Sequence, residues 1–219
     1  MFRSLFLRSA LLLCFSLVMQ CTASDDYDPI SGNYLLKDGE HVLRHKTISG
    51  DLIELSDGSQ FKVMGSDSEY VEEWQSGDKL LISAPFFNLT GKAIFKVHNI
   101  RESESINAFF FKPAKKKHAM SQTISHIDRN YGEIYLVDGS GNENLWKVYE
   151  GDIKKIQTWG YRRDRQTKEK IGDPILIGTN QSNNVLVKKW QSYCDDDMHI
   201  LINYECLEIA PYVRARKVE

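Results

Sequence analysis

Residues 53–63 read IELSDGSQFKV, and this stretch decides the fold. Its large apolar residues all fall at odd positions: Ile53, Leu55, Phe61 and Val63. Apolar side chains at every second residue are typical of a half-buried β-strand. The intervening Ser56-Asp57-Gly58 predicts a three-residue turn in which Gly58 takes a positive φ. Such a turn keeps all four apolar side chains on one face of a β-hairpin, whereas a two-residue turn would divide them between the two faces.

A second stretch repeats this pattern, because residues 134–140 read IYLVDGS and Trp146-Lys147-Val148 follows them. Later landmarks recur in the same order: Trp74, Gly77-Asp78 and Leu81-Ile82, then Trp159, Gly172-Asp173 and Leu176-Ile177. Constant blocks separated by insertions indicate that one ancestral unit was duplicated. We therefore expect Phe61 and Trp146 to occupy matching core positions, and Trp74 and Trp159 to do the same.

Short strand-like runs separated by turn signals fill both copies. They cover residues 80–83, 94–99 and 105–111 in the first copy, and 174–178, 199–204 and 207–214 in the second, which has an extra run at 185–193. The acidic stretch 67–74 predicts a helical or 3₁₀ turn that places Trp74 on the core. We predict an all-β protein of two tandem small β barrels, SH3-like or similar, each with about five or six short strands.

The N-terminus has the features of a signal peptide. Arg3 and Arg8 precede an apolar run at 10–19, which is shorter than the roughly 20 residues that a membrane-spanning helix needs. We expect cleavage before Ser24 and an exported protein, periplasmic or secreted, with no transmembrane span in the mature chain. A lipoprotein modified at Cys21 is the less favoured alternative, because Gln20 stands where a small residue is usual.

These observations divide the chain into segments: a signal peptide at 1–23, a polar segment at 24–41, a first repeat at 42–112, a basic linker at 113–118 and a second repeat at 119–219. The series Asp-Gly-Ser, aromatic-Lys-Val, Trp and Gly-Asp resembles the tandem small β repeats of exported bacterial proteins of uncharacterised function. The resemblance implies the fold and implies no activity, because its motif residues are structural types.

The charge balance excludes one large class of function. Lys and Arg number 28 and Asp and Glu number 30, so the net charge of −2 lacks the broad basic footprint of a specific nucleic-acid-binding protein. No nucleophile motif, phosphate loop, zinc-ligand spacing or paired-carboxylate pattern is recognisable, so we expect no cofactor and no metal site. The sequence favours a non-catalytic binding or interaction module of the cell envelope, with an envelope protein or an anionic polymer as its partner. The alternative is a hydrolase of an envelope polymer with carboxylates in a cleft between the repeats.

Candidate binding residues lie in the insertions of the second copy. Tyr161 stands beside Arg162, Arg163 and Arg165, an aromatic and basic combination suited to an anionic partner, and Trp190 has no counterpart in the first copy. A solvated charged loop is the simpler reading of this segment, because Asp164 and Glu169 dilute its charge.

Cys194 and Cys206 are the two cysteines that lie well beyond the signal segment. Export favours a disulfide between them. A returning strand would instead separate them by roughly 26 Å, at about 3.3 Å per residue. Both possibilities stay open.

Overall fold

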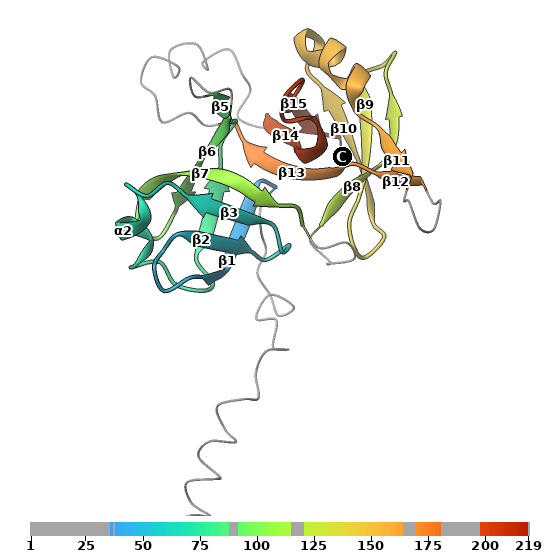
Figure 1. Cartoon of the computed structure of the whole chain (residues 1–219). Coiled ribbons are helices and arrows are strands. Elements are labelled where there is room, and N and C mark those ends of the chain that lie inside the picture. Colours follow the sequence, from blue (N-terminus) through green and yellow to red (C-terminus); the bar gives the residue numbers. More distant parts are fainter. Residues whose placement is uncertain are drawn as a thin grey trace, which may run out of the picture. The chain divides into compact units, whose positions relative to one another are not determined.

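A computed structural model of the chain describes residues 36, 38–87, 92–114, 121–163, 170–180 and 198–218. It contains two closed barrels of six antiparallel strands, drawn from blue to green and from yellow to red in Figure 1. The all-β prediction of two tandem small barrels is therefore confirmed. The predicted signal peptide, Cys21 and most of the basic linker lie outside the described residues. Within the described residues, no helix has the length and apolar character needed to span a membrane.

The first barrel has the strand order β4-β1-β2-β3-β7-β6 and closes through pairing of β4 with β6. Its strands are β1 (Glu40–Lys46), β2 (Leu52–Leu55), β3 (Gln60–Val63), β4 (Lys79–Ile82), β6 (Ala93–Asn99) and β7 (Glu104–Lys112). The short strand β5 (Phe86–Phe87) pairs with β6 beside the barrel. Helix α2 (Ser68–Val71) lies between β3 and β4, where the sequence predicts a helical turn.

The second barrel has the strand order β13-β8-β9-β10-β15-β14. Its strands are β8 (Gln122–Asp128), β9 (Glu133–Val137), β10 (Glu143–Val148), β13 (Pro174–Thr179), β14 (His199–Asn203) and β15 (Tyr212–Lys217). The 3₁₀ helix η1 (Glu150–Thr158) stands where α2 stands in the first barrel. Taken in chain order, each strand of one barrel has the same neighbours as its counterpart in the other, which is the arrangement that duplication of one unit predicts.

The first hairpin has the predicted turn. The backbone N–H of Leu55 donates to the carbonyl of Ser59 at 2.9 Å, so Ser56, Asp57 and Gly58 form the loop. Gly58 has a φ of 84°, a conformation that glycine adopts without steric cost. The four apolar side chains at odd positions are all buried, as expected: Ile53, Leu55, Phe61 and Val63.

The second hairpin keeps the buried face but shifts its turn. The N–H of Asp138 donates to the carbonyl of Asn142 at 3.0 Å, so the loop is Gly139, Ser140 and Gly141. Gly141, with a φ of 89°, therefore takes the place that Gly58 has in the first loop. The two Asp-Gly-Ser motifs do not occupy equivalent places in their turns, because the strands of the second hairpin extend further. The inward side chains remain buried: Ile134, Leu136, Trp146 and Val148.

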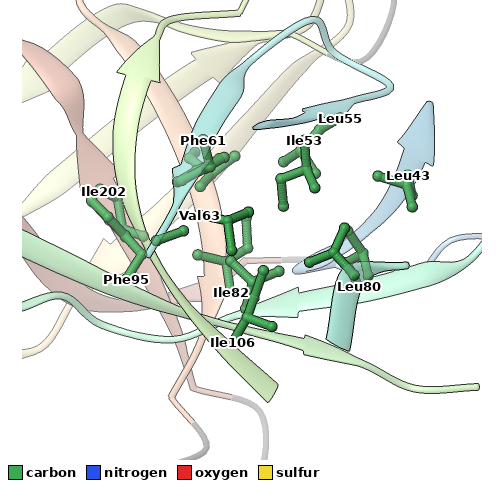
Figure 2. Packing of buried hydrophobic residues seen from close by; sticks show 14 of the residues in the cluster. Leu43, Ile53, Leu55, Phe61, Val63, Leu80, Ile82, Phe95, Ile106 and Ile202 are labelled. Atoms are coloured by element: carbon green, nitrogen blue, oxygen red, sulfur yellow. The ribbon is translucent and has the colours of Figure 1, made fainter. Parts of the chain in front are cut away.

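Large aromatic side chains fill matching positions in the two cores. Phe61 and Trp146 are 0% and 1% exposed, and Trp74 and Trp159 are both 1% exposed. Figure 2 shows Phe61 among the inward-pointing side chains of the first core. Both predicted core pairs are therefore confirmed.

Strands β13 and β14 are buried on both faces. Ile175 and Leu201 belong to the core of the second barrel, whereas Leu176, Ile200 and Ile202 belong to the core of the first. Figure 2 shows Ile202 beside Phe95. Because each fully buried aliphatic side chain contributes roughly 1.5–3 kcal/mol, strands of the second barrel contribute substantially to the stability of the first.

The last strand begins later than the sequence predicts. The expected strand at 207–214 is β15, which starts at Tyr212. A 3₁₀ helix, η2 (Tyr204–Cys206), precedes it, and the Asn203 side chain caps this helix by accepting from the N–H of Glu205 at 2.9 Å. The predicted run at 185–193 lies outside the described residues.

Candidate functional site

The second barrel carries a hairpin that the first barrel lacks. Strands β11 (Tyr161–Arg163) and β12 (Lys170–Gly172) pair as an antiparallel two-stranded sheet between η1 and β13. In the first barrel, only Gln75 and Ser76 connect Trp74 to Gly77. We call β11, β12 and the residues between them the added hairpin. Its strands were not predicted, because each has three residues and shows no apolar alternation.

The base of the added hairpin is attached firmly to the second barrel. The Tyr161 side chain packs against the core of the second barrel, and its hydroxyl donates to the carbonyl of Ser125 at 2.6 Å. Burial raises the pKa of Tyr161, so its hydroxyl stays a donor at neutral pH. A Cβ at Gly172 would lie 1.7 Å from the carbonyl oxygen of Ile124, so only glycine permits this close backbone approach.

The structure places three of the five candidate binding residues. Tyr161, Arg162 and Arg163 form β11, with Arg162 opposite Ile171 and Arg163 opposite Lys170. Tyr161 has a structural role at the base of the hairpin that the sequence did not reveal. Arg165 and Trp190 lie outside the described residues. The binding role of this set stays a prediction.

Of the two cysteines proposed to form a disulfide, the structure describes Cys206. Cys206 is partly buried, and its thiol donates to the carbonyl of Thr158 at 3.7 Å. Burial raises the pKa of this thiol, and the nearby Asp173 raises it further, so the reactive thiolate is disfavoured at neutral pH. Cys194 lies outside the described residues, so the disulfide stays a prediction.

A buried carboxylate organises the connection before β13. Oδ2 of Asp173 accepts from the N–H of Gly160 at 3.0 Å and from the side-chain amide of Asn203 at 2.9 Å. Asn203 is fully buried and Asp173 is 6% exposed. These bonds close the point where the added hairpin leaves and rejoins the barrel, so Asp173 has a structural task.

The first barrel has the same network with one addition. Oδ2 of Asp78 accepts from the N–H of Gln75 at 2.8 Å and from the amide of Asn99 at 2.7 Å. Arg101 also donates to this carboxylate, with Nε 2.6 Å from Oδ1. Burial raises the pKa of Asp78, but the hydrogen bonds from Arg101, Gln75 and Asn99 outweigh it and leave the pKa below its ordinary value. The Gly-Asp motif seen in the sequence is thus half of an Asp–Asn pair, whose asparagines the sequence analysis did not identify.

A third buried carboxylate, Asp152 at 2% exposed, lies in the first turn of η1. Its Oδ2 accepts from Nε of Arg214 at 2.8 Å and from the N–H of Arg214 at 3.0 Å, and Lys155 lies 2.8 Å from its Oδ1. Burial raises the pKa of Asp152, but these donors outweigh it and lower the net pKa. The Arg214 guanidinium also lies over the ring of Tyr149, 4.3 Å from its centroid. This cluster fixes η1 to β15.

The three buried carboxylates Asp78, Asp152 and Asp173 therefore serve the fold. In the described part of the chain, no group of three or more His, Cys, Asp or Glu side chains is placed to hold a metal ion. Comparison of the chain with protein-family models, with curated proteins and with solved structures gives no match. Within the described residues, the added hairpin is a feature of the second barrel that has no counterpart in the first.

Proposed function

We propose that the chain is a non-catalytic binding module, and that the added hairpin is the surface that contacts its partner. The observation that carries this proposal is the difference between two barrels of the same topology. Both barrels need the buried tryptophan and the Asp–Asn pair for their fold, but only the second has a hairpin between them. Surface additions on a rigid scaffold are where binding functions concentrate.

The charge of the added hairpin favours an anionic partner. Five basic residues and two acidic residues lie between Gly160 and Gly172: Arg162, Arg163, Asp164, Arg165, Lys168, Glu169 and Lys170. The whole chain has a net charge of −2, so this basic segment is a local feature. A basic segment attracts an anionic polymer by releasing counterions or by screened attraction. We propose an anionic envelope polymer as the partner, in keeping with the proposed export of the chain after cleavage near Ser24.

The described carboxylates support binding over hydrolysis. Each described aspartate with a displaced pKa has it lowered: Asp51, Asp78, Asp138 and Asp152. A general acid needs the opposite displacement, because it must hold its proton near neutral pH. In addition, Leu176, Ile200 and Ile202 of the second barrel are packed into the first core. Apolar packing thus occupies the described contact where a hydrolase would need a cleft.

The proposal is tested by binding to isolated anionic envelope polymer at two salt concentrations. Replacing Arg162, Arg163 and Arg165 by Ser should weaken binding at low salt and flatten its salt dependence, because fewer counterions are released on association. The matched control replaces three exposed basic residues elsewhere: Arg44, Lys62 and Lys92. Equal losses in the two triple variants would indicate non-specific attraction, and unchanged affinity in the Arg162, Arg163 and Arg165 variant would reject the hairpin as the contact surface.

A further inference from the structure

Two histidines bind the segment around β1 to strands of the second barrel. Nε2 of His41, on β1, lies 2.7 Å from the carbonyl oxygen of Ile177 on β13. Nε2 of His199, on β14, lies 2.8 Å from the carbonyl oxygen of Asp38, just before β1. A carbonyl oxygen only accepts, so Nε2 carries the hydrogen in both imidazoles. The two bonds run in opposite directions across the same contact.

The backbones approach closely around these bonds. A Cβ at Gly39 would lie 3.2 Å from Cδ2 of His199 and 3.3 Å from the carbonyl oxygen of Gly178. A Cβ at Gly178 would lie 2.5 Å from the carbonyl oxygen of Ile82. Two glycines therefore permit a contact that side chains would hold apart.

His41 is the buried member of the pair, with 8% of its surface exposed, whereas His199 is partly exposed. Nε2 of His41 is already committed to the carbonyl oxygen of Ile177. A second proton on this imidazole would place a positive charge on a buried side chain. Burying such a group costs free energy unless a partner compensates for it.

We propose that His41 is an acid-sensitive latch between the two barrels, in which the neutral imidazole holds β1 against β13 and its protonation opens the contact. Burial lowers the pKa of His41, in agreement with this geometry, while the Asp57 carboxylate and the carbonyl of Ile177 act in the opposite direction. The folded contact thus prefers the neutral imidazole. Its stability is fully present above the ordinary histidine pKa of about 6.5 and is lost as the pH falls below that value.

The charged and titratable neighbours of His41 come from several elements. Asp57 lies in the turn between β2 and β3, where its Oδ1 accepts from the N–H and the hydroxyl of Ser59 at 2.8 and 2.6 Å. Tyr204 of η2 lies near Asp57, and burial raises its pKa well above the ordinary value, so it stays neutral. From β4, Lys79 lies 3.0 Å from Glu40. Strand β13 contributes no titratable side chain, since it reads PILIGT.

Hydrogen bonds from Ser59 to Asp57 weaken the attraction of Asp57 for a protonated His41. Because Oδ1 of Asp57 accepts hydrogen bonds from two donors of Ser59, Asp57 acts on His41 through its charge. The Tyr204 ring stacks on Phe110 at 3.8 Å between centroids, so opening the contact would also separate an aromatic pair. The latch therefore couples one proton to the packing between the barrels.

Thiol labelling of the full-length chain tests the latch. Leu176→Cys places a thiol on β13 where the side chain is packed into the first core, and Leu136→Cys places one inside the second barrel. Peptide mass spectrometry locates the label, and an unfolded peptide corrects for the pH dependence of thiol reactivity. With His41 present, the corrected labelling rate at position 176 should rise about three- to tenfold between pH 6.5 and 5.5, with tenfold per pH unit the limit for one proton. The rate at position 136 should rise less.

Variants at His41 remove the pH step without abolishing the measurement. His41→Gln keeps an N–H donor and cannot titrate, and His41→Phe provides a second untitratable side chain if the amide does not fit. Both should give a labelling rate at position 176 that is flat with pH. His45→Gln, an exposed histidine on the same strand, should behave as the parent does. A flat rate in the parent, an unchanged step in both His41 variants or an equal rise at position 136 would overturn the latch.

Discussion

The indole nitrogen of Trp159 donates a hydrogen bond to the carbonyl oxygen of Ala210 at 2.8 Å, with both residues buried. Trp74 fills the matching position of the first barrel, but its indole nitrogen has no hydrogen-bond partner among the described residues. The connection that supplies Ala210 runs from β14 to β15. The corresponding connection in the first barrel, from β6 to β7, is shorter.

This difference predicts unequal costs for the same substitution. Trp159→Phe should lower the free energy of unfolding by about 1 kcal/mol more than Trp74→Phe, because it leaves the buried carbonyl of Ala210 without its donor. The loss of ring volume is the same in both variants and cancels in the comparison. Urea unfolding of the two variants measures the difference, and equal costs would contradict the assigned hydrogen bond.

The Asp–Asn pairs predict the next result. Asn99→Ala and Asn203→Ala should each lower the free energy of unfolding by about 1–3 kcal/mol, because each leaves a buried carboxylate without its amide donor. Arg101 still donates to Asp78 in Asn99→Ala, but this variant also removes the acceptor of the Arg101 and Glu102 N–H groups, so the two costs should be comparable. Asn130→Ala, on an exposed turn, serves as the control. Costs at Asn99 and Asn203 no larger than that at Asn130 would argue against this account of the two networks.

Asp152 predicts part of the acid sensitivity of the fold. Its folded-state pKa is lowered, so its contribution is present above the unfolded-state pKa of about 3.9 and is lost as the pH falls through the folded-state value. Asp152→Asn should cost about 2 kcal/mol at pH 7, less than a fully buried pair, because Arg214 and Lys155 are partly exposed. This cost should shrink below about pH 4.

Unfolding free energies measured from pH 7 to pH 3 test the expectation for Asp152. The curve of the Asp152→Asn variant should be flatter than that of the parent at the acidic end. Glu208→Gln, at an exposed carboxylate, should leave the shape of the curve unchanged. Parallel curves for the parent and Asp152→Asn would mean that this cluster does not titrate with unfolding.

The barrels were predictable from the sequence because the odd or even position of each apolar residue shows which face of the hairpin it occupies. Ile53 and Phe61 share a face only if the turn between them has an odd number of residues, and the glycine at position 58 satisfies that turn. The second turn was harder to place. Both Gly139 and Gly141 are available there, and the length of the hairpin selects Gly141.

The sequence contains a signal for the contact between the barrels, but the sequence analysis did not identify it. Ile175 to Ile177 and Ile200 to Ile202 are continuous apolar runs, the pattern of strands buried on both faces. A search for apolar residues at every second position detects strands with one buried face, so it misses a strand that is buried on both faces. The Asn99 and Asn203 partners could not be inferred, because asparagine is mostly exposed in folded proteins and pairing across the fold leaves no local signal.

The central claim is that both barrels need the shared scaffold, while the added hairpin serves binding. The first barrel supplies the design for a direct test, since Gln75 and Ser76 connect Trp74 to Gly77 without a hairpin. Replacing residues 160–171 by Gln-Ser gives the second barrel the same short connection, and the new Gln N–H can donate to Asp173 as that of Gln75 donates to Asp78. Unfolding and binding to anionic envelope polymer are then measured on one sample. The account predicts a cooperatively folded protein that no longer binds, and a folded variant with the affinity of the parent would contradict it.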